Sequence, residues 1–147
     1  MLIAILLAPI SFAASSGIVS AIEFLFAHTL PEGGWRSVED GITVGAMIYG
    51  LTVAPVLENL LLLGALLVVK RLIVSDVMAS LITALLAASA HMLLSGQIAY
   101  AAVIPGFFVM SMLALSPQTR SEGYWISVVH HIAINSLSVA SILIRHV

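Results

Sequence analysis

Four polar side chains lie in segments that are otherwise apolar, and their types could together carry out hydrolysis. They are Glu58, His91, His131 and Asn135. A carboxylate in an apolar pocket can act as a general base, and a neighbouring histidine can help it hold and deprotonate water. A second histidine and an amide can donate hydrogen bonds to an oxyanion when a carbonyl group is attacked. An alternative is a divalent metal site with Glu58, His91 and His131 as ligands and one open position.

Glu58 is the most unusual of these residues because it is the one acid in the stretch APVLENLLLLGALL, residues 54–67. Lys70 lies about 18 Å further along a helix, so Glu58 falls deep within a hydrocarbon core of about 30 Å. Ionisable groups at this depth are costly and are functional by default. The alternative is a protonated carboxyl group that only bonds a neighbouring helix. Glu23 lies near the end of its apolar segment, and we expect it to be an interfacial or interhelical polar group.

The two histidines come out near the depth of Glu58 when each helix is measured from the same membrane side. His91 lies about 22 Å from Asp76, and His131 lies about 13 Å from Glu122, at the helical rise per residue. Asn135 follows His131 by four residues and shares its helical face. Adjacent residues on a helix are turned apart by about 100°, so two successive histidines are not expected to face inward together. The remaining histidines are predicted to be interfacial: His28, His130 and His146.

The composition indicates whether the segments that carry these residues lie in water or in a membrane. Hydrophobic residues make up 61% of the 147-residue chain and charged residues 8%, and the mean hydropathy is +1.18. Soluble domains have about 25% charged residues, so the sequence predicts an integral membrane protein whose surroundings are the lipid bilayer. The sequence contains no cysteine, which excludes disulfides, thiolate metal sites and a cysteine nucleophile. Its five basic residues form no patch for nucleic acid.

Hydropathy divides the chain into five predicted transmembrane helices, and each reaches at least about the 20 residues that a bilayer requires. The predicted spans are residues 2–27, 41–69, 76–95, 98–116 and 123–145. Pro55 and the pair Pro105-Gly106 are expected to bend or interrupt the second and fourth spans. Ser75 or Asp76 is expected to cap the third span, and Gly96 to end it. The predicted fold is an all-α, polytopic membrane helix bundle that forms a single integral membrane domain over residues 1–147.

The N-terminal segment and the basic residues bear on topology. Residues 1–14 have an apolar core and small residues, as a cleaved secretory signal would, but no basic residue precedes the apolar run. We therefore expect a retained first helix. Basic residues favour the cytoplasmic side of short loops. In the predicted topology, three of them share the side of the N-terminus, which predicts a cytoplasmic N-terminus: Lys70, Arg71 and Arg120, against Arg36 and Arg145 on the other side.

The stretches APVLENLLLLG, AASAHM and HIAIN resemble, in this order, the three signatures of the CPBP intramembrane proteases, which include the CaaX proteases and bacteriocin-processing enzymes. The family pattern is Glu-Glu-x-x-x-Arg, then Phe-x-x-x-His, then His-x-x-x-Asn, each on its own helix. The resemblance covers about residues 50–140 and implies a protease core at about residues 41–145. It implies that Glu58 and His91 activate water, and that His131 and Asn135 stabilise the oxyanion. Its implied substrate is a membrane-tethered or lipidated protein or peptide, and the expected location is a prokaryotic cell membrane.

Three positions depart from the family pattern. Asn59 replaces the second glutamate, Leu63 replaces the arginine, and Ala87 replaces the phenylalanine. Loss of both the glutamate and the arginine leaves no unpaired buried charge, whereas loss of one would. Ala87 is expected to leave space near His91. Two alternatives therefore stay open beside the protease: a catalytically inactive relative with an immunity or accessory role, and a small proton-coupled transporter subunit that uses Glu58 and the histidines as a relay.

Overall fold

The computed structural model describes residues 1–26, 43–116 and 119–145, and this part of the chain is helical with no strand. Backbone groups in lipid have no water to bond, so a helix, which satisfies them internally, is the expected spanning element. The helices are α1 (Leu2–Phe26), α2 (Val44–Leu51), α3 (Val53–Leu72), α4 (Asp76–Ser95), the 3₁₀ helix η2 (Ile98–Val103), α5 (Ile104–Leu115) and α6 (Arg120–Arg145).

Five segments of the described chain are long and apolar enough to cross a membrane. They are residues 2–26, 44–72, 76–95, 98–115 and 120–144. The predicted bounds differ from these by at most three residues. The prediction of an all-α membrane bundle with five spans is therefore confirmed.

The second span is interrupted at Thr52, where α2 ends and α3 begins. Pro55 has no N–H group and leaves a carbonyl one turn earlier without its helical donor, which accounts for the interruption. Two side chains bond carbonyls near this point. The Thr52 hydroxyl donates to Ile48 O at 2.7 Å, and the Asn135 amide of α6 donates to Gly50 O at 2.8 Å. The interruption is thus compatible with a membrane interior, because polar backbone groups near it keep partners.

The third span begins and ends where the sequence predicts. The Ser75 hydroxyl accepts a hydrogen bond from the N–H of Met78 and caps α4, and Gly96 ends the helix with a φ of +69°, a conformation that favours glycine. Lys70, at the end of α3, forms an ion pair of 2.6 Å with Asp76 across the connecting turn. This ion pair joins the end of α3 to the start of α4.

The fourth span is interrupted in a different way. It starts as the 3₁₀ helix η2 and continues as α5, with Pro105 in the first turn of α5. A proline at that position costs little, because the first N–H groups of a helix have no partner within it. The interruption predicted at Pro105-Gly106 therefore lies just before these residues, at the junction of η2 and α5.

Small residues let the helices approach closely, as is common where helices pack in lipid. The buried residues of α4, which packs against α5, are all small: Ala79, Ser80, Thr83, Ala84 and Ala88. On the other side of α5, Gly123 of α6 meets the backbone of Ala114. A Cβ atom added at Gly123 would lie 2.9 Å from the Ala114 carbonyl carbon and would overlap its oxygen. Helix α5 is therefore held closely on both sides.

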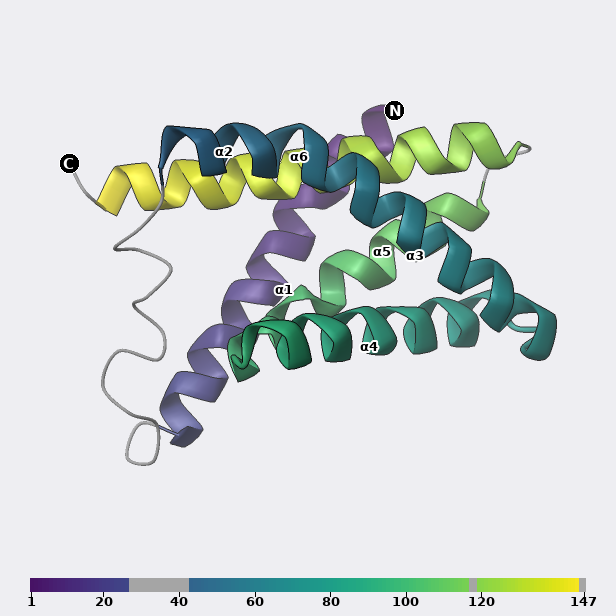
Figure 1. Cartoon of the computed structure of the whole chain (residues 1–147), viewed down its shortest axis with the longest axis horizontal. Helices are drawn as coiled ribbons and strands as arrows, with labels where there is room; N and C mark the ends of the chain where they lie inside the picture. Colours follow the sequence, from purple (N-terminus) through teal and green to yellow (C-terminus); the bar gives the residue numbers. More distant parts are fainter. Residues whose placement is uncertain (27–42, 117–118, 146–147) are drawn as a thin grey trace.

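Helices α4 and α6 lie at opposite edges of the molecule, and α1, α3 and α5 run obliquely between them (Figure 1). Helix α6 packs against α1, α3 and α5, whereas α4 packs against α3, α5 and η2. Side chains of α3 and α5 can therefore meet side chains of both α4 and α6 in the interior, and side chains of α1 can meet those of α6.

His130 corrects one prediction, because it is not interfacial but fully buried, with 0% of its surface exposed. Its Nδ1 donates to Ala4 O at 2.7 Å, and its Nε2 lies 3.2 Å from the Ser11 hydroxyl, so it links α6 to α1. His131 is buried as well, at 7% exposed. Both neighbours face protein because α6 has α1 on one side and α3 on another. The predictions for His28, His146 and Arg36 lie outside the described residues.

Candidate active site

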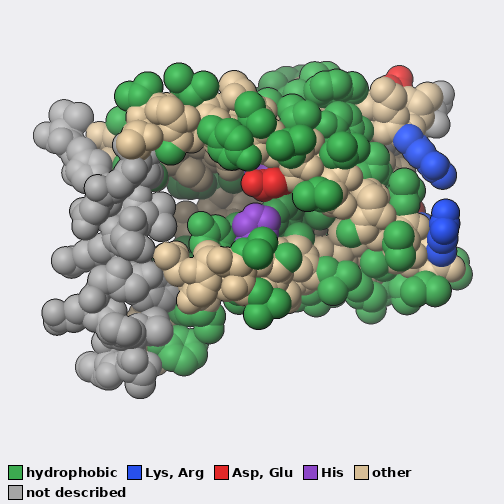
Figure 2. Space-filling view, viewed as in Figure 1, with side chains coloured by type: hydrophobic (Ala, Val, Ile, Leu, Met, Phe, Trp, Pro, Cys, Tyr) green, Lys and Arg blue, Asp and Glu red, His purple; other side chains and the backbone are tan. Residues whose placement is uncertain are grey.

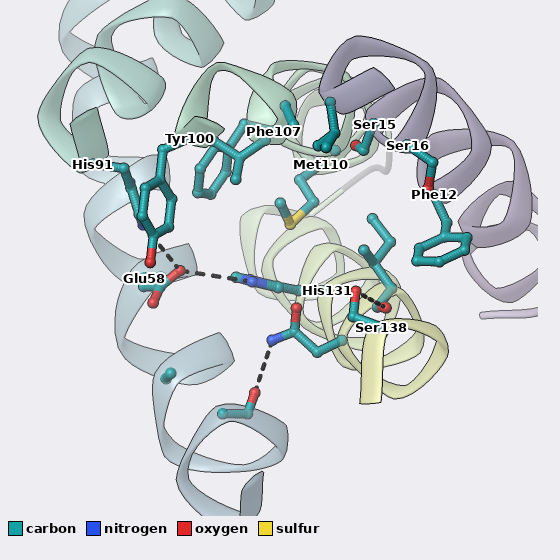
Figure 3. A pocket seen from close by; sticks show the side chains of 18 residues that line it. Phe12, Ser15, Ser16, Glu58, His91, Tyr100, Phe107, Met110, His131 and Ser138 are labelled. Atoms are coloured by element: carbon teal, nitrogen blue, oxygen red, sulfur yellow. Dashed lines mark hydrogen bonds and ion pairs between the residues drawn. The ribbon is translucent and has the colours of Figure 1, made fainter. Parts of the chain in front are cut away.

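A cavity of about 460 Å³ opens inside the bundle, and each of the seven described helical elements contributes to its wall. The four residues singled out by the sequence all line it, together with residues of α1 that include Phe12, Ser15 and Ser16 (Figure 3). By contrast, Glu23 is exposed near the end of α1 and does not line this cavity.

Glu58 lies between the two histidines of the cavity. Its Oε2 is 3.7 Å from His91 Nε2 and 3.6 Å from His131 Nε2 (Figure 3). The side chains of Glu58 and His91 are 35% and 30% exposed, whereas that of His131 is 9% exposed. The face shown in Figure 2 accordingly has an acidic side chain beside a histidine in the middle of a largely apolar surface. Three helices therefore bring one carboxylate and two imidazoles together, as a common depth along the helices predicts.

His91 is held through its other ring nitrogen. Its Nδ1 lies 2.9 Å from the carbonyl oxygen of Ala87, one turn earlier on α4. A carbonyl can only accept, so Nδ1 carries a proton and Nε2 points toward Glu58. Ser95, one turn later, bonds the backbone carbonyl of His91 and the N–H of Gln97. Ser95 therefore caps α4 and does not orient the imidazole ring through these bonds.

Asn59 is a buried member of the site that the sequence marked only as a departure from the family pattern. It is 2% exposed, and its Nδ2 donates to Pro55 O at 2.7 Å and lies 2.9 Å from His131 Nδ1. Its Oδ1 accepts a hydrogen bond from the Ser127 hydroxyl of α6. The sequence does show an amide next to Glu58 in an apolar run. It does not show the partners of this amide, which are on α6, 68 and 72 residues away.

Asn135 lines the cavity one turn beyond His131, as the four-residue spacing predicts. One hydrogen of its amide is used in the bond to Gly50 O at the end of α2. An amide nitrogen has two hydrogens, so one remains for another acceptor. Asn135 thus connects the interrupted second span to the cavity.

Two aromatic rings surround His91, and neither was anticipated from the sequence. The Phe107 ring centre is 5.3 Å from that of His91 and 6.0 Å from that of His131, and the Tyr100 ring centre is 5.7 Å from that of His91. Phe107 is 3% exposed and belongs to a core cluster against which Ala87 packs. The space expected beside Ala87 is therefore filled by this cluster, with Phe107 supplied from α5.

The loss of the family's arginine also has a structural counterpart. Leu63 packs against an apolar cluster of α3, α4 and α5: Leu66, Val69, Ala79 and Ala114. Asn59, the other altered position, has hydrogen-bond partners for both ends of its amide. Neither substitution leaves a buried charge unpaired, as expected for the paired loss.

The described residues include no group of three or more His, Asp or Glu side chains arranged to hold a metal ion. The metal site formed by Glu58, His91 and His131 therefore remains an alternative without geometric support from these residues. Chelation of the active protein is its direct test.

The fold and the cavity define a multi-pass integral membrane protein with a carboxylate and two histidines inside its membrane-spanning segments. A family model, Rce1-like, described as type II CAAX prenyl endopeptidase Rce1-like, matches residues 40–137. No curated protein and no solved structure gave a significant match. The chain belongs to the Rce1-like family of type II CAAX prenyl endopeptidases, in agreement with its resemblance to the CPBP proteases.

Proposed function

We propose that this protein is an intramembrane endopeptidase that hydrolyses peptide bonds of membrane-tethered or lipidated proteins or peptides. One observation carries the proposal: two imidazole Nε2 atoms lie 3.6 and 3.7 Å from one carboxylate oxygen in a cavity between the spans. The family match supports a peptidase for this chain. We expect the protein to act in a prokaryotic cell membrane with its N-terminus in the cytoplasm.

Glu58 and His91 activate the attacking water in this proposal. The separation of 3.7 Å between their facing atoms is longer than a direct hydrogen bond, and a water molecule can bridge such a gap. Glu58 takes a proton from the water, whose oxygen forms a bond to the carbonyl carbon of the peptide. The proton then passes to the leaving amine as the C–N bond breaks, so the glutamate acts first as a base and then as an acid.

His131 and Asn135 stabilise the oxyanion that forms on the carbonyl oxygen during this attack. Both line the same cavity as Glu58 and lie on one face of α6. His131 is the more buried of the two cavity histidines, and hydrogen bonds to a developing charge are strongest where water is excluded. In this proposal Glu58 and His91, which are partly exposed, meet the water, and His131, which is buried, donates a hydrogen bond to the oxyanion.

The cavity also fits a peptide substrate in size and lining. Its volume of about 460 Å³ is in the range of sites that hold ligands of several hundred daltons. The wall contributed by α1 combines an aromatic ring with two hydroxyl groups, from Phe12, Ser15 and Ser16 (Figure 3). Such a wall can contact apolar side chains and also bond an extended backbone.

The experiment that tests this function compares new peptide termini in membranes of cells that express the wild type, Glu58→Gln or His91→Ala. Glu58→Gln keeps the shape of the side chain but removes the base. Glu23→Gln is the matched control, because it makes the same change at an exposed acid outside the cavity. We expect termini that appear with wild type and Glu23→Gln and are absent with both site variants.

Identical termini in all four samples, at equal protein levels, would contradict the proposal. The inactive-relative alternative would then be favoured, with Asn59 and Leu63 as its marks. A pH-dependent proton flux in proteoliposomes that Glu58→Gln abolishes, without cleavage products, would instead favour the transporter alternative.

A further inference from the structure

The hydrogen bonds of Asn59 determine which way its amide faces. Pro55 O, 2.7 Å from Nδ2, can only accept a hydrogen bond. The opposite orientation would place two acceptor oxygens against each other with no hydrogen between them. The Ser127 hydroxyl on the other side donates to Oδ1, in agreement with the first orientation. The NH₂ group therefore faces both Pro55 O and the ring of His131.

This orientation fixes the proton of His131. The second hydrogen of the Asn59 amide points to His131 Nδ1 at 2.9 Å, so Nδ1 must accept and cannot carry a hydrogen. A neutral imidazole with a bare Nδ1 carries its proton on Nε2, and Nε2 is the atom 3.6 Å from Glu58.

The other two described histidines have the opposite arrangement. His91 and His130 each donate from Nδ1 to a backbone carbonyl, of Ala87 and Ala4 respectively. At Glu58 the two cavity rings therefore differ: His91 presents an Nε2 that can accept a proton, and His131 presents an Nε2–H that can donate a hydrogen bond.

We infer that Asn59 is a positioning residue that holds His131 as the Nε2–H tautomer and so makes it a hydrogen-bond donor toward the cavity. A carboxylate at this position, as in the family pattern, would accept from Nδ1–H and favour a proton on that nitrogen. The substitution by asparagine therefore does more than remove a charge. It also changes which nitrogen of the His131 ring carries the proton. The consequence for oxyanion stabilisation rests on the proposed function, whereas the tautomer itself does not.

The test is nitrogen NMR of the purified protein with ¹⁵N-labelled histidine, in a background in which His28 and His146 are replaced by glutamine. Protonated and bare ring nitrogens give well-separated signals, and a His131→Gln sample assigns the ring. We expect a bare Nδ1 at His131 in the starting protein. In Asn59→Asp, which has nearly the same shape, we expect Nδ1 of His131 to become protonated.

The matched control is Tyr124→Phe, which removes another hydrogen bond between α6 and α3, from the Tyr124 hydroxyl to Val56 O. It leaves Asn59 in place, so the His131 signals should not change. If Asn59→Asp does not fold, Asn59→Leu replaces it, and the expected result is a mixture of both tautomers. A protonated Nδ1 in the starting protein, or an unchanged bare Nδ1 in the aspartate variant, would overturn the inference.

Cleavage assays separate this inference from the proposed function. Asn59→Leu should lower kcat by about 10- to 100-fold, the loss that is typical when a metal-binding histidine loses the hydrogen-bond partner that orients it, while Tyr124→Phe should keep kcat. A starting protein with a bare Nδ1 at His131 but no peptidase activity would refute the proposed function and support the tautomer assignment. Cleavage by a starting protein with a protonated Nδ1 at His131 would support the proposed function and refute the tautomer assignment.

Discussion

His130 is predicted to hold α1 against the rest of the bundle, and with it one wall of the cavity. Its two bonds reach Ala4 O at 2.7 Å and the Ser11 hydroxyl at 3.2 Å. Both partners are on α1, and all three residues are buried. His130→Ala removes both of these bonds between α6 and α1.

The expected size of the effect follows from these two bonds. Interhelical hydrogen bonds in membranes contribute about 0.6 kcal/mol on average and up to about 1.7 kcal/mol. Two of them give about 1 to 3 kcal/mol for the separation of α1 from α6. Each 1.4 kcal/mol is a factor of ten in an equilibrium constant. The population of molecules in which α1 has separated from α6 should therefore rise about 5- to 150-fold. His130→Gln should have a smaller effect, because its amide can still donate to Ala4 O.

The separation can be measured with a single cysteine, because the natural chain has none. Ala8 lies on α1 and is 1% exposed, so Ala8→Cys reacts with a maleimide only when α1 moves away. In detergent micelles, His130→Ala should raise the labelling rate of this cysteine by the same factor of about 5 to 150. Ser136→Ala on α6 is the control, since that hydroxyl bonds only the carbonyl of Ile132 in its own helix. An equal labelling rate in His130→Ala and the parent protein would refute the role of His130 as a link to α1.

Three further changes test the packing and the chemistry. Gly123→Ala should lower the free energy of unfolding by about 1 to 3 kcal/mol, because the added Cβ would meet the Ala114 backbone. Gly64→Ala is the control, since a Cβ there meets open space and should not lower stability. Thermal unfolding in detergent compares the two variants. Phe107→Leu should lower kcat for cleavage, because it removes the ring beside both cavity histidines. Phe108→Leu makes the same change outside the cavity wall and should keep kcat. Cleavage should survive a chelator, and activity that is lost with the chelator and restored by a divalent metal would favour the metal alternative.

The sequence was sufficient to predict the elements of the fold. Long apolar runs marked the five spans, and Ser75 and Gly96 marked the ends of α4, because these features depend on local backbone chemistry. The helical rise then predicted a common depth for the acid and histidines that meet in the cavity. Depth is readable in this way because a membrane gives each helix the same reference plane.

The rotation of each helix was harder to predict, and this explains the errors and omissions. Lipid and protein interiors are both apolar, so a pattern of hydrophobic residues does not show which face of a spanning helix meets a neighbour. His130 was placed at the interface for this reason, although α1 covers it. The ring of Phe107 and the partners of Asn59 come from helices distant in sequence, and no local signal indicates such contacts.

The most direct test of the central claim is cleavage by the purified protein in proteoliposomes, with a substrate peptide taken from the termini that the wild type generates in membranes. Removal of a general base typically costs a factor of about 10² to 10⁴, so Glu58→Gln should lower kcat by that factor while its fold and stability are kept. Equal rates for wild type and Glu58→Gln would contradict the claim that Glu58 activates water.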